Sequence, residues 1–200
     1  MQTFSQNAAL LIIDVQNGFD DPYWGRRNNP QMEARIVDLL SAWRASNRPV
    51  IHAKHMSVDP ISPLRPGQSG NEFKVRMTPM PGEYVVEKRA NNCFIGTPLE
   101  AELRRRRHDA LVIVGMTTNH CVSTTTRMAG DLGFDAWVVS DATATFDRVG
   151  PDGINYPAEQ IQAIALSDLN GEFGRVVDTA TVLAAMQTPL GAFSARREPA

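Results

Sequence analysis

Cysteine is scarce in this chain of 200 residues, which contains only Cys93 and Cys121. Two cysteines are too few for the disulfide framework that stabilises many small secreted domains. The opening MQTFSQNAALLIIDVQ also lacks the basic segment of a signal peptide, and Asp14 interrupts its apolar run. We therefore expect free thiols, a cytoplasmic location and no membrane-spanning segment.

An excess of charge of one sign is also lacking. The formal net charge is -2 at pH 7, from 20 Lys plus Arg against 22 Asp plus Glu. A chain with this balance has no overall electrostatic attraction toward nucleic acid or an anionic membrane. The expected partner is therefore a small molecule, with no nucleic acid and no membrane.

Common metal and nucleotide motifs are absent too. The sequence contains no HExxH, no CxxC, no P-loop and no GxGxxG after an expected strand. His52 and His55 are three residues apart on an expected strand, so their side chains should point to opposite faces. That arrangement does not suit the chelation of a metal ion by one strand.

What the sequence does contain is a regular alternation of two patterns. Short runs rich in β-forming residues predict strands at 8–14, 49–56, 83–88, 110–116, 134–140 and 174–179. Amphipathic patterns predict helices at 31–46, 97–107, 119–134, 156–169 and 179–187. Several of the strand runs are apolar at successive residues, which is typical of strands covered on both faces. The alternation predicts an α/β fold with an open, doubly wound parallel sheet.

The length suits one domain, residues 1–200, with its core at about 8–185. Residues 57–82 are rich in proline and glycine and long for a connection, so we expect them to line a site. Residues 189–200 are expected to form a flexible tail or an arm onto a neighbouring subunit. In the helix predicted at 97–107, Thr97 should be the N-cap and Pro98 the first helical residue.

Three reactive residues occupy the carboxyl ends of expected strands, where doubly wound sheets bind ligands. Asp14 ends LLIID, Lys88 ends EYVVEK and is one of only three lysines, and Cys121 begins the helix after ALVIVGM. A helix amino terminus lowers the pKa of a thiol and can hold an oxyanion. Taken singly, each residue also fits a structural role: a cap or salt bridge, a surface lysine, and a core cysteine.

His120 is the obvious candidate for the base that would activate Cys121. Adjacent residues on a helix point roughly 100° apart, so His120 does not face the sulfur. We interpret it as a partly exposed polar residue. Cys93 has no electropositive turn near it in the sequence, and we assign it to packing.

Three segments together carry a family resemblance. The stretches LLIIDVQNGF, VVEKRANNCFIGTPLEAEL and VIVGMTTNHCVSTTTRMAGDLGFDAWVVSDATAT, in this order and spacing, resemble the isochorismatase-like cysteine hydrolases. The resemblance implies a three-layer α/β/α sandwich with a six-stranded, mostly parallel sheet. It also implies a catalytic triad of Asp14, Lys88 and Cys121, and a cis peptide bond between Met116 and Thr117. Members of the family are usually dimers or larger homo-oligomers.

The family mechanism implies a role for each of these residues. Asp14 would take the thiol proton, Cys121 would attack an amide carbonyl, and Lys88 would keep Asp14 charged. The backbone N–H groups of Thr117 and Cys121 would form the oxyanion hole. Asp14 would then protonate the leaving nitrogen, and water would hydrolyse the thioester.

The sequence departs from two branches of the family. Nicotinamidases carry an Asp-x-His metal motif after the second strand, whereas this chain has His55 where the aspartate would fall. We therefore expect no metal, no cofactor and no nicotinamidase activity. True isochorismatases hydrolyse a vinyl ether and lack the cysteine, so the presence of Cys121 argues against isochorismate as the substrate.

The resulting hypothesis is a cysteine-dependent hydrolase that cleaves a C–N bond of a small amide, lactam, carbamoyl or ureido compound. Two alternatives stay open: an isochorismatase-type vinyl ether hydrolase, with Asp14 as the acid, and a non-catalytic small-molecule-binding protein. The candidate substrate-binding residues lie mainly on strand-end loops, and many are aromatic. They are Phe19, Trp24, Asn92, Phe94, Thr118, Phe146 and Tyr156.

Overall fold

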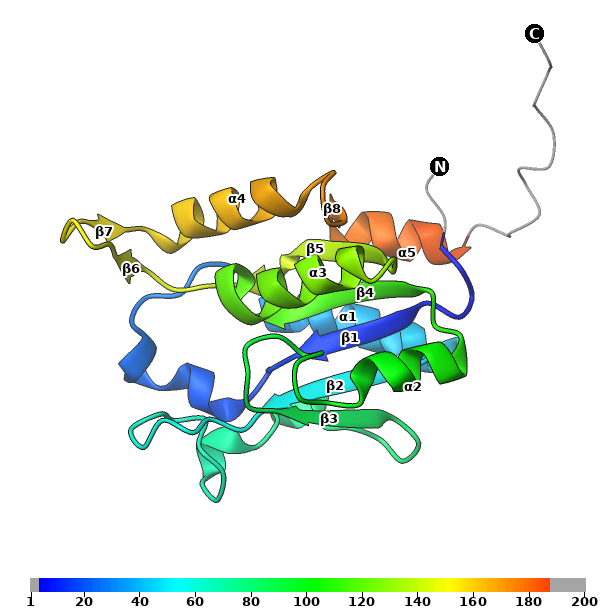
Figure 1. The fold of residues 1–200 in the computed structure, drawn as a ribbon, viewed down its shortest axis with the longest axis horizontal. Coiled ribbons are helices and arrows are strands. Elements are labelled where there is room, and N and C mark those ends of the chain that lie inside the picture. The colour runs from blue at the N-terminus through cyan, green and yellow to red at the C-terminus, as the bar shows by residue number, and fades with distance from the viewer. Residues whose placement is uncertain (1–3, 188–200) are drawn as a thin grey trace, which may run out of the picture.

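A parallel sheet forms the centre of the structure, a computed structural model that describes residues 4–187 (Figure 1). Within these residues the sheet has six strands in the order β3-β2-β1-β4-β5-β8, and every neighbouring pair is parallel. The strands are β1 (Ala9–Ile13), β2 (Val50–His55), β3 (Tyr84–Lys88), β4 (Ala110–Met116), β5 (Asp135–Ala144) and β8 (Arg175–Val177). The predicted doubly wound α/β fold is confirmed. The expected tail at 189–200 lies outside the described residues.

Helices cover both faces of this sheet and produce the expected three layers. The helices are α1 (Met32–Ala45), α2 (Leu99–Arg106), α3 (Ser123–Asp131), α4 (Ala158–Leu169) and α5 (Thr179–Gln187). The apolar residues of α1 and α5 share one core cluster, and those of α2, α3 and α4 share the other. Figure 1 shows α2 and α3 in front of the sheet and α1 behind it. None of the helices within residues 4–187 has the length and apolar character needed to cross a membrane.

The central strands are apolar at successive residues because each face of the sheet is covered. In β1, Leu10 and Ile12 join the core cluster on the α1 side. Leu11 and Ile13 join the cluster on the α2 and α3 side. All four side chains are buried, so a continuous apolar run supplies two cores at once.

Shorter elements connect these strands and helices. Single 3₁₀ turns lie at Asn17–Asp20, Pro22–Trp24, Ser69–Asn71 and Val75–Met77. A two-stranded antiparallel hairpin of β6 (Arg148–Val149) and β7 (Asn155–Tyr156) precedes α4. The sequence analysis did not foresee this hairpin, because two-residue strands carry no readable periodicity.

The start of α2 differs from the expectation. Thr97 was expected as the N-cap and Pro98 as the first helical residue, but the helix begins at Leu99 and Pro98 is its N-cap. The Thr97 hydroxyl still accepts a hydrogen bond from the Leu99 N–H at 3.3 Å. The same hydroxyl also donates to the carbonyl of Cys93, which ties Thr97 to the preceding loop and delays the helix.

The candidate site lies where the strand order of the sheet reverses, between β1 and β4. The chain leaves β1 toward β2 and β3 on one side, and β4 and β5 lie on the other side. In open α/β sheets such a reversal leaves a crevice at the carboxyl ends of the strands. Gly115 of β4 lies against β1 there, with a φ of +116°, and a Cβ on it would lie 2.0 Å from the Ile13 carbonyl oxygen.

Gly115→Ala should lower the free energy of unfolding by at least about 2 kcal/mol, because it adds both backbone strain and a steric overlap. Gly133→Ala is the matched control, since Gly133 also has a positive φ, +82°, but open space around its Cβ position. The control should cost about 1 kcal/mol. Urea unfolding followed by circular dichroism measures both values, and equal losses would contradict the steric argument.

Candidate active site

Asp14 follows the last residue of β1 at the crevice. Its backbone N–H donates to the Ala53 carbonyl at 3.0 Å, and its φ of +54° turns the chain away from the sheet. The carboxylate is fully buried. Its Oδ2 accepts a hydrogen bond from Lys88, whereas Oδ1 has no hydrogen-bond partner among residues 4–187.

Lys88 is the last residue of β3 and the centre of the cluster. Its Nζ lies 2.6 Å from Asp14 Oδ2, 3.1 Å from His55 Nδ1 and 3.4 Å from Cys121 Sγ. A fourth contact joins it to the Ala90 carbonyl at 3.3 Å. Burial lowers the pKa of Lys88, but the Asp14 carboxylate raises it by more, so the amine stays protonated.

Cys121 lies in a π-helical turn, Thr118–Val122, which leads directly into α3. The expected position at the start of this helix is confirmed. The expected lowering of its pKa is not: burial and the Asp14 carboxylate raise the pKa of the thiol well above its usual range, although Lys88 opposes them. The resting side chain is therefore a thiol that needs a base to become a nucleophile.

The peptide bond between Met116 and Thr117 is cis, as the resemblance implies. It joins the end of β4 to the turn that carries Cys121. Thr117 and Cys121 both line a cavity at the crevice. The two residues expected to form the oxyanion hole therefore border the same space.

The cavity has a volume of about 60 Å³, which suits a small group such as a carboxamide rather than a macromolecule. Residues from five segments surround it. The lining residues are Asp14, Phe19, Trp24, His55, Leu64, Asn91, Thr117, His120 and Cys121. Leu64 comes from the segment 57–82, which was expected to line a site.

Two of the expected substrate-binding aromatics, Phe19 and Trp24, line the cavity. Their ring centroids are 4.9 Å apart. Phe146 stacks on both, at 6.0 Å from Phe19 and 5.7 Å from Trp24, but does not itself line the cavity. Phe146 therefore supports the aromatic wall from behind.

Asn92 and Phe94 do not line the cavity. The Asn92 amide donates to the Thr124 carbonyl at 3.0 Å and accepts from the Phe94 N–H at 2.9 Å. Phe94 packs on Phe134 at 6.0 Å between centroids, in the core on the α2 side. Both side chains hold the loop after Lys88 in place, a structural role that residue type alone does not reveal.

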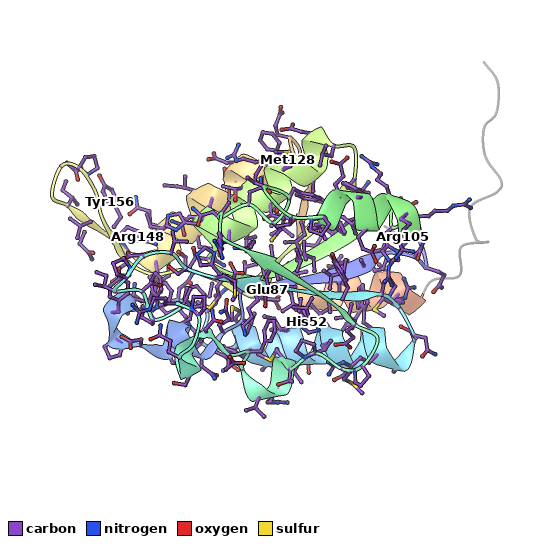
Figure 2. All side chains as sticks on the ribbon, turned by 60° about the horizontal axis from the view of Figure 1, so that its bottom comes forward. His52, Glu87, Arg105, Met128, Arg148 and Tyr156 are labelled. Carbon is purple, nitrogen blue, oxygen red and sulfur yellow. The ribbon has the colours of Figure 1, made fainter. Side chains whose placement is uncertain are left out.

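Thr118 and Tyr156 also lie away from the cavity lining. Thr118 is fully buried, and its hydroxyl donates to Gln162 Oε1 at 2.9 Å. Tyr156 lies on the β6–β7 hairpin, which Figure 2 shows projecting from the body of the molecule, and its hydroxyl donates to Asp152 at 2.6 Å. The Thr118 contact depends on a partner from α4, whereas Asp152 lies in the loop of the same hairpin as Tyr156.

The structure adds residues that the sequence analysis left out of the site, namely His55, Leu64, Asn91 and His120. Asn91 Oδ1 accepts a weak hydrogen bond from the Cys121 thiol at 3.7 Å. His120 lines the cavity, but the hydrogen bond of its Nδ1 is with Arg148 at 3.2 Å, and none joins it to Cys121 within residues 4–187. The interpretation that His120 is not the base agrees with this geometry. Cys93 is buried in the core, as expected for a packing residue.

One cluster has the chemistry of a metal site. Asp14, His55 and Cys121 each offer a ligand atom, and these atoms lie within 4.8 Å of one another. However, the Lys88 ammonium contacts all three side chains and would repel a second cation. His52 is not part of this cluster: it points to the opposite face of β2 from His55, and its Nε2 contacts Glu83 at 2.8 Å. The expectation of no metal stays a prediction.

The chain is similar to known proteins along nearly its whole length. Residues 8–181 match the isochorismatase domain family. YrdC, an isochorismatase family protein of Bacillus subtilis, is 42% identical over 174 residues, which cover 87% of this chain and 93% of YrdC. The ureidoacrylate amidohydrolase RutB of Caulobacter segnis is 30% identical over 176 residues, or 88% of this chain and 65% of RutB.

Crystal structures give the same result. A protein of the isochorismatase family from Chromobacterium violaceum superposes with a TM-score of 0.90 and 45% identity, covering 93% of this chain and 96% of that one. A cysteine hydrolase from Pseudomonas syringae superposes with a TM-score of 0.84 and 25% identity, covering 93% and 95%. Together with the cluster of Asp14, Lys88 and Cys121, these matches show that the chain belongs to the isochorismatase family of hydrolases.

Proposed function

We propose that this protein is a cysteine-dependent hydrolase that cleaves a C–N bond of a small amide, lactam, carbamoyl or ureido compound through a thioester. The observation that carries the proposal is the buried contact of one lysine with both a carboxylate and a thiol. Lys88 Nζ lies 2.6 Å from Asp14 Oδ2 and 3.4 Å from Cys121 Sγ, at the edge of a small cavity. This arrangement supplies a nucleophile, a base and a cation that keeps the base ionised.

Asp14 is the base in this proposal. Burial and the Asp14 charge hold the Cys121 side chain as a thiol, so its proton must leave when sulfur attacks. Asp14 Oδ1 has no hydrogen-bond partner within residues 4–187 and is therefore open to that proton. Lys88 remains protonated, and its Nζ lies 2.6 Å from Asp14 Oδ2, so a positive charge lies beside the base.

The first half of the reaction forms the thioester. Asp14 takes the proton from Cys121 while the sulfur electron pair forms a C–S bond to the substrate carbonyl carbon. The π electrons of the carbonyl move to oxygen, where the N–H groups of Thr117 and Cys121 stabilise the negative charge. The oxyanion then reforms the carbonyl, the C–N bond breaks, and Asp14 gives its proton to the leaving nitrogen.

The second half uses water and restores the enzyme. Asp14 takes a proton from a water molecule, and the hydroxide oxygen attacks the thioester carbon. The C–S bond breaks, its electron pair returns to sulfur, and Asp14 returns a proton to Cys121. The products are a carboxylic or carbamic acid and ammonia or an amine, and no cofactor takes part.

The substrate class rests on the cavity and on one relative. A cavity of about 60 Å³ with an aromatic wall of Phe19 and Trp24 suits a small, partly apolar compound. RutB is a ureidoacrylate amidohydrolase, and its similarity favours amide or ureido chemistry over ether hydrolysis. A small-molecule partner, a homodimer or larger homo-oligomer and a cytoplasmic location complete the proposal.

Cys121→Ala should lower turnover at least about 10³-fold, because Cys121 is the only thiol among residues 4–187 that lines the cavity. The measurement is a screen for ammonia or amine release over small amides, ureas and lactams, with folding checked by circular dichroism. Cys93→Ala is the matched control, since Cys93 is the other buried cysteine and lies outside the cavity lining. Amide turnover by Cys121→Ala would refute the nucleophile, and full activity on isochorismate would favour the ether hydrolase.

Asp14→Asn should separate two effects of the carboxylate. Turnover should fall by about 10²–10⁴-fold, because the variant cannot transfer protons. Alkylation of Cys121 by iodoacetamide should become faster at neutral pH, because the Asp14 charge raises the pKa of the thiol and Lys88 lowers it. Mass spectrometry of the alkylated protein gives the rate, and unchanged turnover would contradict the role of Asp14 as the base.

Activity should persist after the protein is stripped of metal ions with EDTA. The reason is that Lys88 already contacts each side chain that could ligate a metal in the cavity. The measurement compares turnover before and after dialysis, with metal content determined by atomic emission. Loss of activity that returns on addition of a divalent cation would show that the reaction needs a metal.

A further inference from the structure

We propose that His55 is a positioning residue: in its neutral form it accepts a hydrogen bond from Lys88, holds the ammonium between Asp14 and Cys121, and inactivates the site when it is protonated. The inference rests on the proposed function, because it concerns the same three residues. It assigns a role to a cavity-lining side chain that the mechanism above leaves unused.

The first argument is the match between donors and acceptors around Lys88. A lysine ammonium has three N–H donors and no acceptor. Asp14 Oδ2 at 2.6 Å, His55 Nδ1 at 3.1 Å and the Ala90 carbonyl at 3.3 Å accept from it, and Cys121 Sγ is next at 3.4 Å. A histidine nitrogen can accept only when it carries no proton, so His55 must be neutral, with its proton on Nε2.

The second argument is that the backbone holds His55 rigidly. His55 and Lys88 are directly paired in the parallel register of β2 and β3, which places their side chains on the same face of the sheet. The His55 N–H donates to Gln16 Oε1 at 2.8 Å. The His55 carbonyl accepts from Gln16 Nε2 at 3.1 Å and from Asn71 Nδ2 at 2.8 Å. Hydrogen bonds at both the N–H and the carbonyl fix the backbone of His55, as is required of a residue whose side chain positions Lys88.

The charges around His55 favour its neutral form. Burial and the neighbouring Lys88 charge lower the pKa of His55, and the Asp14 carboxylate opposes them without reversing the shift. Cys121, from the π-helical turn, faces the same cavity as a thiol, and His120 lines it from the same turn. His55 is therefore neutral at pH 7 and titrates at a more acidic pH than an ordinary histidine.

Protonation of His55 has two consequences for Lys88. The Nδ1 acceptor is lost, and a positive charge appears 3.1 Å from the ammonium. Both effects drive Lys88 away from its position between Asp14 and Cys121. The acidic limb of the pH–rate profile should therefore follow the ionisation of His55.

The first test needs no substrate. Long-range ¹H–¹⁵N spectra of the wild-type protein, labelled in its histidines, report which ring nitrogen of His55 carries the proton, and His55→Asn assigns the signals. We expect the Nε2–H form at pH 7.5, and conversion to the doubly protonated form at a pH below the ordinary value of about 6.5. An Nδ1–H form, or an imidazolium at pH 7.5, would overturn the proposal.

The second test uses turnover and a pair of variants at position 55. His55→Asn keeps an acceptor near the Nδ1 position but cannot be protonated, so the kcat plateau should stay within about threefold and the acidic limb should move to lower pH. His55→Leu removes the acceptor, so kcat should fall at least about tenfold at every pH, with KM nearly unchanged. An acidic limb at the wild-type position in folded His55→Asn would overturn the proposal, as would full kcat in His55→Leu.

His120→Asn is the control for the second test, because His120 is the other histidine of the cavity and does not contact Lys88. Its acidic limb should match that of the wild type, and a limb that moves with His120 would contradict the assignment to His55. The two tests also separate this proposal from the proposed function. If the proposed substrate class is wrong, no turnover is seen, but the ring spectra still test the role of His55. Normal amide turnover together with an Nδ1–H ring would refute the role of His55 and leave the proposed function intact.

Discussion

The buried ion pair between Lys88 and Asp14 is the interaction on which the site depends. Both side chains are almost completely inaccessible to water, and their charged atoms are 2.6 Å apart. A buried charge without a partner is strongly destabilising, so neither residue can leave this position without the other. The pair therefore fixes the ends of β1 and β3 relative to each other. Its ammonium also contacts the sulfur of Cys121 at 3.4 Å.

The topology of the sheet brings the three residues of the cluster together. β1 and β4 are neighbours where the strand order reverses, and β3 is two strands from β1 on the other side. Lys88 reaches across β2 to Asp14, and it passes His55, which is its direct partner in the register. The close approach of Gly115 to Ile13 brings the turn that carries Cys121 to the same edge. The catalytic chemistry is thus a property of the crevice rather than of one segment.

Burial changes the chemistry of the cysteine as much as its neighbours do. A helix start alone would lower the pKa of Cys121, yet desolvation and the nearby carboxylate raise it. Because the thiol is protonated at rest, the proposed mechanism moves its proton to Asp14 during the attack rather than before it. In the proposed mechanism the same carboxylate then holds the proton that the leaving nitrogen needs, which links the activation of the nucleophile to the release of the product.

The sequence by itself determined the layers of the fold and the three reactive residues, Asp14, Lys88 and Cys121. The spacing of apolar residues and the apolar runs can be read from each segment alone, so they predict the helices and strands. Parallel strands then bring their carboxyl ends, with these three residues, to one edge of the sheet. Only the tertiary structure decided that His55 contacts Lys88 and that the Thr118 hydroxyl is bound by Gln162 of α4 outside the cavity lining. Those contacts depend on strand register and on how separate turns pack, and neither is encoded in the pattern of a single segment.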